Sequence, residues 1–214
     1  MKHILKLILF LLLVSCVNNQ GSNISHQQKR SSINRQNQEK PPLPDGWEYG
    51  KISEVQGSDK TEINLLSQLN TYNKALLRGD IDNAKIYLYS DAIRYFRKYY
   101  INMRDDDIVD EFFKDASDVY LAIRQTFEEK GVLVDIFPIG INKKISDGNN
   151  LLYLIDISTT VYNEKISIYT SPETIIGISI NQGRNWTFIT RNSDSPNILR
   201  FRFKENVINQ VMEY

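Results

Sequence analysis

The spacing of apolar residues changes at Gly131, and this change constrains the fold more than any other feature of the sequence. Before Gly131, apolar residues recur every three or four positions, which is typical of amphipathic helices. After Gly131 they alternate with polar residues or form short runs bounded by turn residues, which is typical of strands. Helices followed by a meander of antiparallel strands predict an α+β fold, with the helices packed on one face of the sheet.

The helix-type spacing and the capping residues predict five helical segments. Asp80 and Ser90 are of the residue types that cap helices, and an acidic run before the longest segment suits a helix N-terminus. The expected segments are Thr61–Leu77, a short helix capped by Asp80, Ser90–Tyr100, about Asp106–Lys130 and Glu205–Met212.

The strand-type segments are separated by turn residues. Pro138 predicts a bulge or a sheet edge within the first of them, because proline cannot donate a ladder hydrogen bond. The uninterrupted apolar run in the second predicts burial on both faces. The expected strands are Val132–Asn142, Leu151–Tyr162, Lys165–Thr170 with Glu173–Asn181 as one strand or a broken pair, and Arg184–Thr190 after a hairpin turn at Asn181-Gln182-Gly183.

The N-terminus has the pattern of an export signal. Lys2 and Lys6 precede an apolar run from Leu7 to Val14, which is too short to span a bilayer. The run ends at Leu13-Val14-Ser15-Cys16, which resembles the lipobox of bacterial lipoproteins. That resemblance implies cleavage of residues 1–15, a diacylglyceryl group on the Cys16 thiol and an acyl chain such as palmitate on the new N-terminus. The alternative is an ordinary secretory signal.

The stretch after Cys16 predicts a tether. It is rich in Asn, Gln, Ser and basic residues and ends in a proline-rich segment, so it has little apolar surface with which to form a core. We therefore expect a lipidated, disordered tether over residues 16–44 and a single domain over residues 45–214, with its core at about 61–190. Position 17 is Val, not Asp, which favours the outer membrane if the cell has two membranes.

Three stretches of the predicted domain resemble the nuclear transport factor 2-like family, also called SnoaL-like. They are the helix running into Leu77-Arg78-Gly79-Asp80, the long helix ending at Gly131, and the hairpin from Asn181 to Phe188, in which Trp186 opens a strand. The resemblance implies a cone-shaped domain in which a curved sheet and helices often enclose a pocket. Trp186 and Trp47 are weak candidate ligand-binding residues; for Trp47, at the domain entry, docking on the domain as an entry clamp is the favoured interpretation.

The predicted domain holds few residues suited to catalysis. Cys16 is the only cysteine, and His3 and His26 both precede the domain, so the commonest general base and transition-metal ligands are missing from it. Asp156, which shares a strand face with leucines, is a weak candidate for a general base with a raised pKa, and Asp135 is weaker. The acidic run Asp105–Asp107 lacks the spacing of a calcium loop. We expect no metal site and no cofactor.

The aromatic segment Tyr87–Tyr100, interleaved with Arg94, Arg97 and Lys98, is interpreted as helical core packing, with a binding patch as the alternative. The 26 basic and 26 acidic residues balance, and the predicted envelope address argues against a nucleic-acid partner.

Together these features predict a lipid-anchored cell-envelope protein whose domain is a non-enzymatic binding or assembly module for an envelope protein or a small apolar ligand. Two alternatives stay open: a small pocket enzyme that uses Asp156, and an inhibitor or immunity-type lipoprotein.

Overall fold

The computed structural model describes residues 43, 45–111, 113, 125, 131–164 and 167–213. The chain divides into two units, Met1–Trp47 and Glu48–Tyr214, and the second contains nearly all of the described residues. The predicted signal peptide, Cys16 and almost all of the predicted tether lie outside the described residues, as does most of the helix predicted over Asp106–Lys130.

The first two helices of the second unit begin at aspartate caps. Helix α2 (Lys60–Leu77) starts after Asp59, whose carboxylate accepts from the backbone N–H groups of Thr61 and Glu62. Asp80 caps α3 (Ile81–Lys85) by accepting from Asn83 N, as predicted. The remaining described helices are α4 (Ser90–Phe96), residues 105–111, α6 (Ser195–Leu199) and α7 (Glu205–Met212).

Two details predicted for α4 are wrong. The cap residue is Tyr89, so Ser90 is already helical, and the helix ends at Phe96 instead of Tyr100. After Phe96 the backbone tightens into successive turns, because the N–H groups of Tyr99 and Tyr100 donate to carbonyls only three residues earlier. Residues 97–104 therefore form a turn between two helices rather than a continuation of α4.

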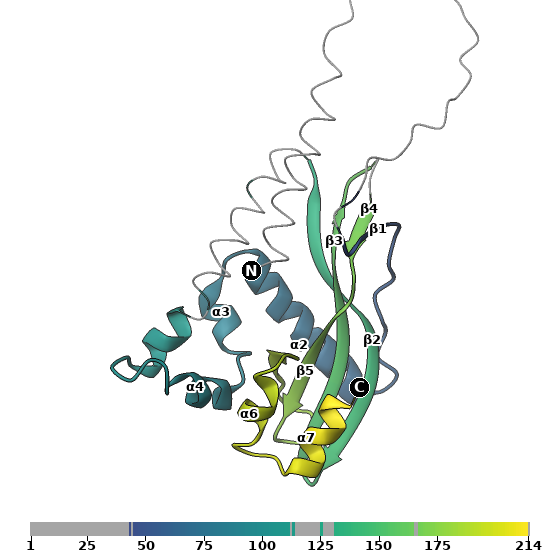
Figure 1. The fold of residues 1–214 in the computed structure, drawn as a ribbon. Coiled ribbons are helices and arrows are strands. Elements are labelled where there is room, and N and C mark those ends of the chain that lie inside the picture. Colours follow the sequence, from purple (N-terminus) through teal and green to yellow (C-terminus); the bar gives the residue numbers. More distant parts are fainter. Residues whose placement is uncertain are drawn as a thin grey trace, which may run out of the picture. The chain divides into compact units, whose positions relative to one another are not determined.

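Strand β3 (Asn150–Tyr162) is the centre of the sheet (Figure 1). It pairs antiparallel with β2 (Leu133–Asp147) along one side and with β4 (Ser167–Thr170) and β5 (Glu173–Ser179) along the other. Beyond these lie β1 (Trp47–Tyr49), next to β4, and β6 (Thr187–Thr190), next to β5. The register of β2 shifts between Pro138 and Gly140, which confirms the predicted bulge.

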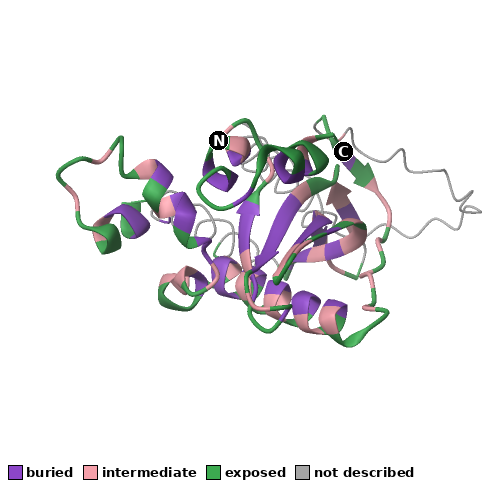
Figure 2. Ribbon diagram, turned by 90° about the horizontal axis from the view of Figure 1, so that it is seen from below, coloured by how far each residue is buried: buried purple, intermediate pink, exposed green. Residues whose placement is uncertain are grey.

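Helices cover both faces of this sheet, so the predicted arrangement on one face is wrong (Figure 2). Tyr153 and Ile155 pack with Leu65 and Leu69 of α2. Leu152 and Leu154, which point to the other face of the sheet, belong to the core that contains the apolar residues of α6 and α7. The physical reason is the apolar run in β3: both of its faces are hydrophobic, and each needs a cover. The cover of the second face comes from the C-terminal segment, which lies beyond the predicted core at 61–190.

The loop from Ile180 to Trp186 replaces the predicted short hairpin. Strand β6 begins at Thr187, not at Arg184, because side chains of α2 form hydrogen bonds with the backbone that precedes it. The Asn64 amide donates to Gly183 O at 2.6 Å and to Arg184 O at 3.0 Å, and Gln68 Oε1 accepts from Trp186 N at 2.9 Å. These bonds hold the loop against α2 instead of pairing it with β5.

Candidate binding surface

The two tryptophans predicted as binding residues are both buried. The Trp186 indole packs 5.1 Å from the Tyr153 ring, measured between ring centroids, and its Nε1–H donates to Gly183 O at 3.1 Å. Its neighbours belong to the core under α2, and Trp47 in β1 is also buried. A binding role for either residue stays a prediction, as does the lipidation of Cys16.

Asp156, the candidate base, lies half-buried in β3 between Gly140 of β2 and Thr174 of β5. Its carboxylate accepts from the Thr174 hydroxyl at 2.9 Å. Asp135 is also half-buried, and its carboxylate accepts from the backbone N–H of Ile136 at 2.9 Å. The contact from Thr174 fixes the position of the Asp156 carboxylate within the sheet.

Two of the three carboxylates of the acidic run make ion pairs with arginines. Asp105 pairs with Arg97, and both carboxylate oxygens of Asp107 accept from Arg104 at 3.0 and 3.1 Å. Among the described residues, no group of three or more His, Cys, Asp or Glu side chains is arranged to hold a metal ion.

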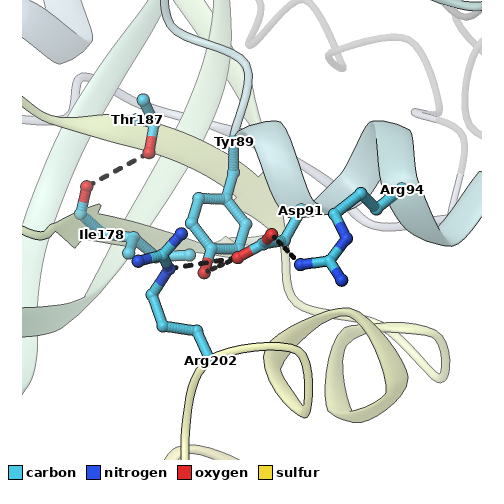
Figure 3. Close-up of polar contacts among 6 residues, drawn as sticks. All are labelled: Tyr89, Asp91, Arg94, Ile178, Thr187 and Arg202. Atoms are coloured by element: carbon cyan, nitrogen blue, oxygen red, sulfur yellow. Dashed lines mark hydrogen bonds and ion pairs between the residues drawn. The ribbon is translucent and has the colours of Figure 1, made fainter. Parts of the chain in front are cut away.

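The buried carboxylate of Asp91, in the first turn of α4, makes three polar contacts (Figure 3). It accepts from the Tyr89 hydroxyl at 2.8 Å, from Arg202 Nε at 3.1 Å and from an Arg94 Nη at 3.4 Å. Burial, and then the neighbouring Asp91 charge, raise the pKa of Tyr89, so its hydroxyl stays protonated and can donate. Arg202 lies between α6 and α7, so this carboxylate joins α4 to the C-terminal segment.

Arg94 connects the same two segments a second time. Its guanidinium carbon lies 4.6 Å from the centroid of the Phe201 ring, within the range of a cation–π contact. Phe201 is 44% exposed, and the next residue, Arg202, contacts the buried Asp91 carboxylate. The Phe201 ring itself lies against the guanidinium of Arg94. Asp91 thus fixes the position of an exposed aromatic ring.

The turn after α4 adds further exposed apolar side chains. Tyr99 is 63% exposed and Ile101 is 83% exposed. The Lys98 ammonium lies 3.6 Å from the centroid of the Tyr95 ring and 4.7 Å from that of Tyr99, and the buried Tyr95 in turn donates its hydroxyl to Asp194 at 2.7 Å. We name these exposed aromatic, aliphatic and cationic side chains the α4 surface; it consists of Arg94, Lys98, Tyr99, Ile101 and Phe201.

Part of the α4 surface was visible in the sequence and part was not. The predicted aromatic segment Tyr87–Tyr100 divides in the structure: Tyr89 and Tyr95 are core residues, whereas Tyr99 is exposed. Asp91 and Phe201 were missed as site residues. Asp91 has the position of an ordinary first-turn acid, and its partner Arg202 lies 111 residues away.

Comparison of this chain with family models, with curated proteins and with solved structures found no match. The part of the chain that the structure describes contains no helix with the length and apolar character needed to cross a membrane.

Proposed function

We propose that this chain is a lipid-anchored protein of the cell envelope whose domain is a non-enzymatic binding or assembly module. In this proposal Cys16 carries the lipid, residues 16–44 are the tether, and the α4 surface contacts an envelope component, namely an envelope protein, a small apolar ligand or the membrane itself. If the cell has two membranes, the outer one is the proposed location.

One observation carries the binding role: the α4 surface exposes three large apolar side chains and is nevertheless fixed in place. Exposed apolar residues scattered singly are ordinary, but a cluster of them with basic neighbours is typical of an interaction site. The buried Asp91 holds Phe201 close to α4 through Arg202 and Arg94, and Tyr95 anchors the turn through Asp194. Such ordering before binding reduces the entropy that a partner has to offset.

The family-level proposal for the fold is a cone-like domain of the nuclear transport factor 2-like type. It is supported by the order of the elements, with helices α2 to α4 before strands β2 to β6, and by an antiparallel sheet that bends and does not close (Figure 1). Helices α6 and α7, which cover the second face of the sheet, are an addition to that pattern.

The proposal is tested in living cells by two measurements. Metabolic labelling with a palmitate analogue is expected to mark the wild-type chain and not Cys16→Ala. A photo-crosslinking amino acid at Tyr99 is expected to capture an envelope component, whereas the same group at the exposed Ile63 on α2 is not. A wild-type chain without label overturns the anchor, and identical products from positions 99 and 63 overturn the α4 surface as the binding site.

A further inference from the structure

We propose that the α4 surface binds the interface of a bilayer containing anionic phospholipid, so that the domain contacts the membrane at a second point besides its lipid. This inference rests on the proposed function, because it deepens the partner of the same site. Three properties of the surface favour a bilayer over a protein partner: its shape, its charge and its distance along the chain from Cys16.

The shape is that of a tip. The most exposed apolar residues, Tyr99 and Ile101, lie in the turn between α4 and the helix at residues 105–111. Figure 1 and Figure 2 both place this turn at the outer margin of the described part of the second unit, away from the sheet. A projecting apolar turn can enter a fluid interface without a complementary surface, whereas a protein partner has to provide a matching hollow.

The charge around the tip is suited to anionic headgroups. Residues 91–107 and 200–205 hold seven basic and five acidic residues, and the five arginines among them are ion-paired. The cations available to anionic headgroups are therefore chiefly the lysines. Lys98 lies at the base of the tip, with its ammonium over two tyrosine rings, and Arg94 lies beside Phe201. Amphipathic aromatic side chains with lysine and arginine around them are the residues that proteins place at headgroup level.

The chain between Cys16 and the second unit is long enough for this contact. Roughly 30 residues separate Cys16 from Glu48, and each residue reaches at most about 3.5 Å. A domain of this size has a radius of gyration of about 15 Å, so the α4 surface can approach the bilayer that holds the lipid. Because the anchor keeps the domain near the membrane, even a weak contact is populated.

The test uses the full lipidated chain, anchored in vesicles and labelled with an environment-sensitive fluorophore at Asn102→Cys. Residue 102 is exposed in the tip, and in the lipidated chain the Cys16 thiol is already occupied, so the label is unique. With phosphatidylglycerol in phosphatidylethanolamine vesicles, we expect the emission to shift to that of an apolar environment, and to be quenched by a lipid-borne quencher. In phosphatidylcholine alone, and for the same label at the exposed Asn185→Cys, we expect emission typical of water.

Two variants give the magnitudes. Lys98→Gln is expected to lower the ratio of inserted to free label about fivefold, the usual contribution of one basic residue at an anionic surface. Ile101→Ser is expected to lower it about tenfold, as for a lost large aliphatic side chain. Ile63→Ser on α2, which removes a comparably exposed isoleucine, is the matched control and is expected to leave the ratio unchanged.

The outcomes separate the two proposals. A label at residue 102 that stays in water in anionic vesicles overturns the membrane contact, as does an equal loss from Ile101→Ser and Ile63→Ser. If the label enters an apolar environment only after envelope proteins are added, the bilayer inference is wrong while the binding module stands. A chain that takes no lipid at Cys16 instead refutes the proposed function itself.

Discussion

Removal of the Asp91 carboxylate is the sharpest test of how the α4 surface is held. In Asp91→Ala, the buried Tyr89 hydroxyl and the Arg202 guanidinium both lose their acceptor. A hydrogen bond to a charged group contributes about 1.5–3 kcal/mol, and the bond from Tyr89 is buried, so we assign it that full value. The Arg202 side chain is 36% exposed and the Arg94 side chain 63% exposed, so solvent screening reduces each of those pairs to at most about 1 kcal/mol.

We therefore expect Asp91→Ala to lower the free energy of unfolding by about 2–4 kcal/mol. Asp91→Asn keeps an acceptor for Tyr89 and loses only the charge, so its cost is expected to be about 1–2 kcal/mol. Arg94→Ala is the matched control on the same helix, with an expected loss of about 1 kcal/mol or less.

Urea unfolding followed by circular dichroism measures these differences. With a slope of about 2 kcal/mol per molar urea, Asp91→Ala is expected to lower the midpoint by about 1–2 M. Hydrogen exchange is expected to increase in α4 and in residues 200–204 before it increases in the sheet. A midpoint unchanged by Asp91→Ala, or an equal loss from Asp91→Ala and Arg94→Ala, contradicts the argument that the buried carboxylate joins the two segments.

Two further predictions concern the core under and beside α2. The Lys144 ammonium and the Ser58 hydroxyl lower the pKa of the buried Glu62 from 4.5 to about 2. This stabilisation is therefore present above about pH 5 and is lost as the pH falls towards 2. It amounts to at most about 3–4 kcal/mol, since one pKa unit corresponds to 1.36 kcal/mol. Urea midpoints of Glu62→Gln are expected to vary less over that pH range than those of wild type. An added Cβ at Gly177 would lie 2.9 Å from Leu65 Cδ1 in the core, so Gly177→Ala is expected to lower the free energy of unfolding by about 1–3 kcal/mol, measured by thermal unfolding. Gly140→Ala, whose Cβ meets only an asparagine side chain, is the control and is expected to cost less. Equal losses from the two variants would show that packing under α2 is not the cause.

The sequence was sufficient to predict the elements whose signals are local. The spacing of leucines predicts α2 within one residue, Asp80 caps α3 as expected, and Pro138 lies at the β2 bulge. In each case the residue that decides the structure is adjacent to the structure it decides. The two-residue turn that joins β2 to β3 at Gly148-Asn149 follows the same rule, with a positive φ at the glycine.

Features that depend on distant partners could not be predicted in this way. The start of β6 is set by amides of Asn64 and Gln68, nearly 120 residues earlier in the chain. The α4 surface depends on Arg202, whose sequence environment gives no sign that it pairs with a buried carboxylate on another helix. Side-chain hydrogen bonds of this kind leave no periodic pattern, so the sequence shows the residues without showing the contact.

The packing of helices on both faces of β3 has a consequence for the polypeptide as it is synthesised. The face formed by Leu152 and Leu154 is synthesised well before α6 and α7, the helices that finally shield it. Until residue 212 has emerged, this side of the newly paired strands lacks the part of its cover that α6 and α7 provide, and exposed apolar surface of that kind recruits chaperones and invites aggregation. A premature stop at one of residues 191–194 therefore yields a product whose sheet is complete but whose second face lacks that cover, and quality-control proteases are expected to recognise it.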